Sequence, residues 1–146
     1  MKRGKLNILI DNLRSLTVEN QTEAALQIIE RHEAELVDLN IAQLQQGIDT
    51  TGKRLRKYRS EKYAAIKRQF NPRGVTDLNL TGSHYRGMKI DASEFPVEFY
   101  SSDYKSRRLE EEYGNIYGLT TENKEGPAKE ILGPSVQDYY RSFLDV

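Results

Sequence analysis

The sequence predicts a single α+β domain, because a helical hydrophobic period in its first third gives way to short strand-like segments in its middle. Apolar residues within 21–46 recur at every third or fourth position, which is the period of an amphipathic helix. Residues 75–100 instead contain brief runs with alternating apolar positions, separated by glycine and proline, as is typical of strands. A chain of 146 residues is the usual size of one domain. We therefore expect a long N-terminal helix, a small antiparallel sheet and a short C-terminal helix.

The long helix is predicted to begin after Asn20 and to end before Gly47. Asn20 and Glu23 are spaced like the two members of a capping box, and glycine is a common residue just beyond a helix. Residues 1–20 are expected to form an arm or a short helix, and residues 21–146 the domain itself. The apolar stripe of the long helix consists of Leu26, Ile29, Leu36, Val37, Ile41 and Leu44.

The elements that follow are predicted to be shorter. Residues 46–53 are expected to form a loop because two glycines bound them, and a basic helical segment is expected over 58–70. The last helix is predicted over 134–144, because proline is well tolerated in the first turn of a helix. Strand segments are expected at 75–80, 88–90 and 94–100, and a further short helix at 104–113.

The composition argues against an enzyme that depends on a metal or a thiol. The chain has no cysteine, which excludes disulfides and cysteine-based chemistry, and it has only two histidines. Neither His32 nor His84 lies in a motif such as HExxH, so both are expected to be structural or surface residues. The glycines form neither a phosphate-binding loop nor a nucleophile elbow. We expect no catalytic activity, no cofactor and no metal site.

The first residues briefly resemble a secretion signal. Basic residues precede the apolar run 6–10, but that run stops at Asp11, and a signal peptide needs about 7–15 apolar residues. No segment approaches the roughly 20 apolar residues of a membrane span. We therefore expect a cytoplasmic protein, or one that is made in a cytoplasm and then assembled into something larger, without contact to a membrane.

Charge is distributed unevenly along the chain, although Lys plus Arg and Asp plus Glu both number 22. Residues 53–73, called the basic segment below, contain Glu61 as their one acidic residue, whereas residues 91–125 are mainly acidic. Blocks of opposite charge can pair within one chain, pair between neighbouring copies, or bind different partners. The candidate contacts to a subunit or to DNA are Lys53, Arg54, Arg56, Lys57 and Arg59, and the candidate acidic partner surface is Glu110, Glu111 and Glu112.

The two charged blocks allow several interpretations. Three consecutive glutamates on a helix point in different directions, which favours a solvated or partner-binding face over a metal site. The basic segment also contains Tyr58, Tyr63 and Phe70, and aromatic rings among cations can stack on nucleic-acid bases. The same rings can instead form the apolar face of a short helix or part of a subunit interface. The residues alone leave these alternatives open.

Four motifs, in the order in which they occur, resemble those of one protein family. Residues 41–53 are IAQLQQGIDTTGK, and residues 77–90 are DLNLTGSHYRGMKI. Residues 113–120 are YGNIYGLT, and residues 131–136 are ILGPSV. Together they resemble the virion-morphogenesis or neck proteins of tailed phages (the tail-completion and head–tail connector proteins), as in phages of Bacteroidetes, including crAss-like phages. The resemblance covers residues 40–146.

The resemblance implies a structural protein of the virion rather than an enzyme. Members of this family form rings in the neck between portal and tail, so it implies a homo-oligomer of six or twelve copies. The implied partners are other copies of the chain, the portal, other neck or tail proteins, and packaged DNA in the channel. The protein would be synthesised in the host cytoplasm and then assembled into the virion. The alternative hypothesis is a nucleic-acid-binding accessory protein that uses residues 53–73.

Overall fold

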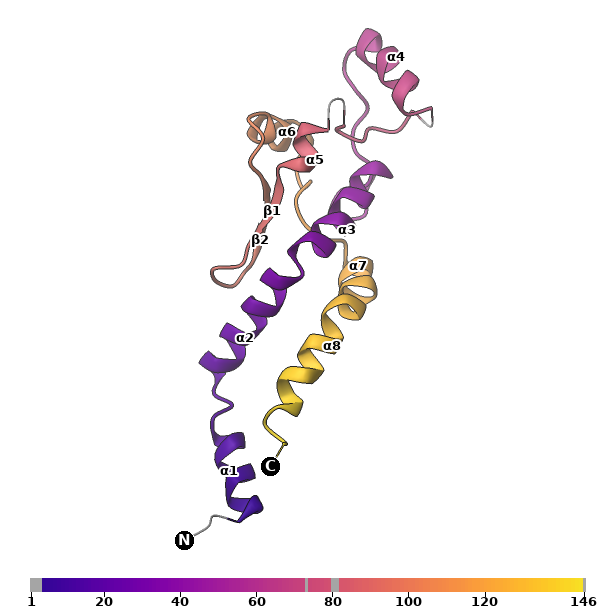
Figure 1. Ribbon diagram of the computed structural model, residues 1–146. Coiled ribbons are helices and arrows are strands. Elements are labelled where there is room, and N and C mark those ends of the chain that lie inside the picture. The colour runs from indigo at the N-terminus through magenta and orange to yellow at the C-terminus, as the bar shows by residue number, and fades with distance from the viewer. Residues whose placement is uncertain (1–3, 73, 80–81, 146) are drawn as a thin grey trace.

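The computed structural model describes residues 4–72, 74–79 and 82–145, and it is mostly helical with one small sheet. Figure 1 shows an elongated molecule in which three successive helices form one long side and a C-terminal helix lies beside them. The α+β expectation is therefore confirmed only in its coarse form. The elements on the long sides are α1 (Lys5–Arg14), α2 (Val18–Arg31), α3 (Glu33–Gln45) and α8 (Pro127–Arg141).

The long N-terminal helix is confirmed, with a different start and an interruption. Its cap is Thr17 rather than Asn20: the Thr17 hydroxyl accepts a hydrogen bond from the backbone N–H of Asn20, as an N-cap side chain does. The helix is broken at His32, whose backbone angles (φ −104°, ψ 16°) separate α2 from α3. The preceding short helix is present as α1, within the predicted arm.

The predicted short C-terminal helix is wrong, because α8 has 15 residues. The helix begins at Pro127 rather than Pro134, and Pro127 occupies the first turn, where its missing N–H costs no hydrogen bond. Pro134 lies inside the helix. The helix continues through Pro134 because α8 packs along α2 and α3, and tertiary packing overrides a local breaking signal.

The sheet has two antiparallel strands, β1 (Met88–Asp91) and β2 (Glu98–Ser101). Met88 pairs with Ser101, and Asp91 pairs with Glu98. The strand expected at 75–80 is absent from residues 75–79, and the rest of that prediction lies outside the described residues. Leu78 has a positive φ of 60°, which interrupts an extended strand. The remaining helices are α4 (Glu61–Phe70), α5 (Ser83–Arg86), α6 (Ser106–Tyr113) and α7 (Thr121–Glu125).

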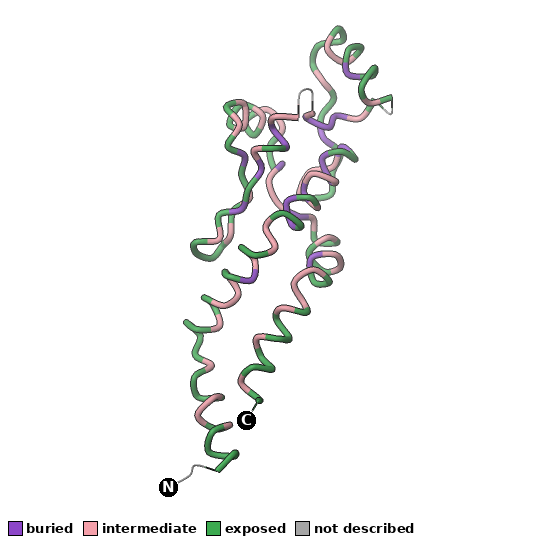
Figure 2. Tube along the Cα trace, in the orientation of Figure 1, coloured by how far each residue is buried: buried purple, intermediate pink, exposed green. Residues whose placement is uncertain are grey.

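The core lies at one end of the molecule. Figure 2 shows buried residues gathered around α3 and the hairpin, whereas α1 and the first half of α2 are largely exposed. Leu44 of α3 and Ile116 are fully buried, and Leu36, Ile90 and Leu119 pack in the same cluster. The stable body of the fold is therefore the end that carries the charged segments, and the opposite end is a thinner helical extension.

Two amide side chains of α3 hold the segment 116–120 against the core. Asn40, which is fully buried, donates to the carbonyl of Ile116 (3.0 Å) and accepts from the N–H of Gly118 (2.9 Å). Gln43, one turn later, donates to the Gly118 carbonyl (3.0 Å) and accepts from the N–H of Thr120 (2.9 Å). The backbone of an irregular segment thus finds hydrogen-bond partners inside the protein, which fixes the segment that follows α6.

Candidate interaction site at the basic segment

The first part of the basic segment is anchored by one buried residue and leaves its cations outside. Leu55 is buried, and its N–H donates to the carbonyl of Gly47 at 2.7 Å. Arg54 also forms an isolated antiparallel bridge with Ile48, beyond the end of α3. The predicted contact residues lie on both sides of Leu55 in the sequence, and all are exposed: Lys53, Arg54, Arg56, Lys57 and Arg59.

The two charged blocks pair within the chain at Glu112. The Glu112 carboxylate lies 3.3 Å from the Arg56 guanidinium and 3.8 Å from Nε of Arg59. Arg56 also donates to the backbone carbonyl of Glu112 (3.0 Å) and lies over the ring of Tyr113, 5.5 Å from its centroid. Blocks of opposite charge can pair within one chain, pair between copies or bind different partners. Arg56, Arg59 and Glu112 show the first of these, pairing within the chain.

The other predicted charges remain on the surface. Within the described part of the chain, Lys53, Arg54 and Lys57 have no carboxylate within 4.0 Å. Glu111 pairs with Arg107 one turn earlier (3.1 Å), and both side chains are mostly exposed. Glu110 is exposed. The three consecutive glutamates of α6 point to different surroundings, as their helical positions predicted.

Lys67 differs from the other cations of the segment because it is buried. Its Nζ lies 2.7 Å from Oδ1 of Asp77, and the Lys67 side chain is only 3% exposed. Asn71 donates to the other carboxylate oxygen of Asp77 (3.1 Å), and the hydroxyl of Tyr58 lies 3.4 Å from Oδ1. The N–H of Asn79 also donates to Oδ1 (3.0 Å). Asp77 thereby fixes α4 to the segment 74–79, and Lys67 is a structural residue.

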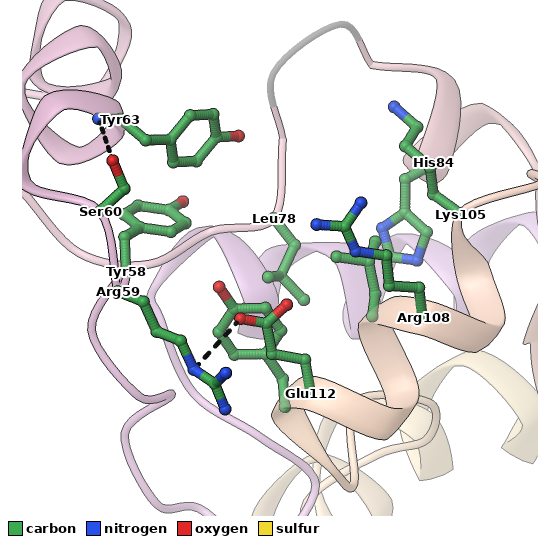
Figure 3. Close-up of a pocket in the computed structure, with 11 residues that line it drawn as sticks. Tyr58, Arg59, Ser60, Tyr63, Leu78, His84, Lys105, Arg108 and Glu112 are labelled. Atoms are coloured by element: carbon green, nitrogen blue, oxygen red, sulfur yellow. Dashed lines mark hydrogen bonds and ion pairs between the residues drawn. The ribbon is translucent and has the colours of Figure 1, made fainter.

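A pocket of about 590 Å³ lies between the basic segment and α6. Figure 3 shows Tyr58, Arg59 and Tyr63 on one side and Lys105, Arg108 and Glu112 of the α6 region on the other. Lys105, Arg108 and Glu112 are spaced i, i+3 and i+7, so they share one face. This spacing is the sequence signal that indicates a shared face for Lys105, Arg108 and Glu112. It was missed because the three consecutive glutamates 110–112 made this part of the chain look simply acidic. The remaining lining residues are Ser60, Leu78, His84, Leu109 and Tyr113.

The tyrosines of the pocket are neutral near pH 7. Tyr58 and Tyr63 pack edge to face, with ring centroids 5.0 Å apart. Burial raises the pKa of Tyr58, Tyr63 and Tyr113 above 10.0, and nearby carboxylates contribute in the same direction. All three hydroxyls therefore keep their protons and can donate hydrogen bonds.

His84 closes the inner wall of the pocket. Its Nε2 lies 2.8 Å from the hydroxyl of Tyr117, which donates in turn to the carbonyl of Ser106 (3.3 Å). Burial lowers the pKa of His84 below its ordinary value of 6.5. Its Nδ1 is buried and has no hydrogen-bond partner among the described residues. His84 and His32 both hold structural contacts, and Nε2 of His32 lies 3.0 Å from Oγ of Ser135 in α8.

The described residues contain no cluster of three or more His, Asp or Glu side chains that could hold a metal ion. Among the same residues, no helix is both long and apolar enough to cross a membrane. Comparisons of the chain with protein-family models, with curated proteins and with solved structures found no match.

Proposed function

We propose that this chain is a structural subunit of the tailed-phage neck, which forms a homo-oligomeric ring between portal and tail and acts by assembly. Two independent observations support the proposal. The four sequence motifs resemble those of neck proteins. The N-terminal helix, in addition, carries an apolar face that the chain itself does not cover. The uncovered apolar face of α1 is the structural support for the proposal, because such a face is normally covered by another protein surface.

The apolar face of α1 follows helical spacing. Leu6, Ile10 and Leu13 are spaced i, i+4 and i+7, and they are 68%, 38% and 45% exposed. None of the 10 residues of α1, all of which the structure describes, is buried. An amphipathic helix whose apolar stripe faces solvent is stable in an assembly that covers it, since an isolated helix of this length is marginal in water. In the proposed ring, a neighbouring copy covers this stripe.

The charged residues would support the same ring. Arg56 and Arg59 already pair with Glu112 of their own chain. Lys53, Arg54 and Lys57 are left for a heterologous contact, in which one patch of a subunit meets a different patch on the next. Glu110 offers the acidic counterpart on a neighbouring subunit, and Glu111, which pairs at the surface with Arg107, lies next to it. The phosphates of packaged DNA offer a second counterpart to the same cations. The proposed location is the virion, after synthesis in the host cytoplasm.

The test is the mass of the purified chain in solution, measured by light scattering at low and high salt. We expect a ring of six or twelve copies. Leu6→Asp together with Leu13→Asp should give a monomer, because two charges would enter the apolar contact. Asn7→Asp, on an exposed position of the same helix, is the control and should leave the mass unchanged. A monomer at both salt concentrations, for the unmodified chain, would overturn the ring.

A nucleic-acid-binding accessory protein is the second candidate, and the exposed cations Lys53, Arg54 and Lys57 favour it. Cations that bind phosphates release counterions, so the affinity would fall steeply as salt rises. The test is oligonucleotide binding by the chain at several salt concentrations. Arg54→Glu with Lys57→Glu should abolish the steep salt dependence while the Leu6→Asp and Leu13→Asp changes leave it intact. Binding that ignores the Arg54 and Lys57 changes would exclude this candidate.

A further inference from the structure

The pocket between the basic segment and α6 contains more positive than negative charge. Arg59, Lys105 and Arg108 line it, and Glu112 is the one carboxylate among the lining residues. Glu112 lies near Arg59, at 3.8 Å. Within the described residues, Lys105 and Arg108 have no carboxylate within 4.0 Å. The ammonium of Lys105 lies over the ring of Tyr104, 5.5 Å from its centroid, so Arg108 is the cation that enters the pocket without a carboxylate partner (Figure 3). Such a cation attracts an anion, and arginine presents a planar fork that matches phosphate.

The same pocket offers aromatic surfaces and hydroxyl donors. Figure 3 shows the Tyr63 ring directed toward the space that Arg108 enters from α6. The hydroxyls of Tyr63 and Tyr113 form no hydrogen bond with any described residue. Both are protonated near pH 7, because the ordinary pKa of tyrosine is already about 10 and burial raises it further. Tyrosine faces next to cations suit a planar group that is attached to an anion, because the ring stacks while the cation binds the charge.

One buried polar atom lies in the wall of the pocket. His84 is only 3% exposed, and its Nδ1 has no partner among the described residues. A buried nitrogen without a hydrogen bond is costly, since burial removes its contact with water. A polar group held in the pocket would lie beside the residue that carries this nitrogen.

We propose that this pocket binds a nucleotide, with its phosphate on Arg108 and its base against the ring of Tyr63 or Tyr113. A volume of about 590 Å³ falls in the range of sites for molecules of this size. Free nucleotides and single-stranded nucleic acid both present a base joined to a phosphate. Binding of adenosine monophosphate and of oligodeoxythymidine distinguishes the two sources. The site requires no ring, so it can be tested whether or not the assembly proposal holds.

The first experiment measures binding of adenosine monophosphate and of inorganic phosphate by calorimetry. We expect the nucleotide to bind more tightly than phosphate, because only the nucleotide has a base to stack. Arg108→Gln should weaken nucleotide binding about tenfold or more, which is the loss expected for one charge-assisted hydrogen bond. Arg107→Gln is the matched control: Arg107 is the adjacent, 90% exposed residue that pairs with Glu111 and does not line the pocket.

A second pair of variants tests the aromatic half of the site. Tyr63→Leu should weaken binding of adenosine monophosphate and leave binding of inorganic phosphate unchanged. Tyr100→Leu, on strand β2 and outside the pocket, should change neither. An equal loss for both ligands would show that Tyr63 does not contact a base, and would overturn the proposed arrangement.

Single-stranded oligodeoxythymidine is the third ligand. Binding of the oligonucleotide but not of adenosine monophosphate, with the same loss in Arg108→Gln, would identify a nucleic-acid strand as the source of the nucleotide. Absence of binding by both, or equal losses in Arg107→Gln and Arg108→Gln, would overturn the proposal. Binding of a polyglutamate peptide in their place would assign the pocket to an acidic protein segment and would likewise overturn it.

Discussion

Lys67 and Asp77 form a buried ion pair, with Nζ and Oδ1 2.7 Å apart and side chains that are 3% and 11% exposed. The pair joins α4 to a segment without regular secondary structure. The carboxylate of Asp77 also accepts hydrogen bonds from Asn71 and from the backbone of Asn79, so its negative charge is stabilised by donors in addition to Lys67. The position of α4, and with it one wall of the pocket, depends on this contact.

Lys67→Met should lower the free energy of unfolding by about 3–5 kcal/mol, because it leaves the carboxylate of Asp77 buried without its cation. Urea denaturation measures the change. Lys62→Met, at an exposed position of the same helix, should change the stability by less than about 0.5 kcal/mol. The double variant Lys67→Met with Asp77→Asn should lose less than the sum of the two single changes. Additive losses would mean that the two residues do not interact.

Asn40→Ala should destabilise the protein by about 2 kcal/mol or more, since it leaves one buried and one partly buried backbone group without partners, and a buried group costs about 1–3 kcal/mol. The two groups are the carbonyl of Ile116 and the N–H of Gly118. Gln45→Ala, at an exposed position of α3, is the control. Amide hydrogen exchange at Gly118 should accelerate in Asn40→Ala and stay slow in Gln45→Ala. Unchanged protection at Gly118 would contradict the hydrogen bond.

Stability should fall as the pH is lowered from about 6.5, because burial holds the pKa of His84 below its value in the unfolded chain. Below that unfolded value the unfolded state binds a proton that the folded state rejects, which favours unfolding by up to about 1.4 kcal/mol per pH unit. Above about pH 6.5 both states are neutral and the effect vanishes. The measurement is urea denaturation between pH 5 and 8 for the native chain and for His84→Gln. The two curves should diverge only in the acidic half, and parallel curves would refute the assignment.

Pro134→Ala should stabilise α8 by up to about 3 kcal/mol, because alanine restores a backbone donor inside the helix and removes a steric conflict. Gly133→Ala should give a smaller gain of about 1 kcal/mol, since open space surrounds the position where its methyl group would lie. Thermal unfolding measures both changes. A loss of stability in Pro134→Ala would show that the proline is needed for the packing of α8 on α2 and α3.

The long helix was predictable because the three- and four-residue spacing of its apolar residues can be read within one continuous segment of the sequence. The break at His32 was not predictable: the apolar period continues through it, and the contact of the His32 ring with Ser135, 103 positions away in the sequence, exists only in the folded chain. The extent of α8 was missed for a similar reason: a proline within a helix is normally a boundary, and packing against α2 and α3 carries this helix through it.

The candidate site was predictable only in part. The two blocks of opposite charge are visible in the sequence, but their internal pairing depends on the folded position of Glu112 relative to Arg56. Lys67 looks like any other cation of the basic segment, and only burial against Asp77 distinguishes it. The pocket face of α6 could have been found from the spacing of Lys105 and Arg108.

The break at His32 and the proline at position 134 lie at the same level of two neighbouring helices. Nε2 of His32 lies 3.0 Å from Oγ of Ser135, the residue next to that proline. At His32 the backbone leaves the helical angles, although its N–H still bonds the carbonyl of Ile28 and its own carbonyl still accepts from Leu36. In α8, Pro134 has no N–H to donate to the helix. Both helices therefore depart from regular geometry at one level, which is the level where the thin end meets the core. In the proposed ring, the geometry at this level would set the angle at which the thin end of one copy meets its neighbour.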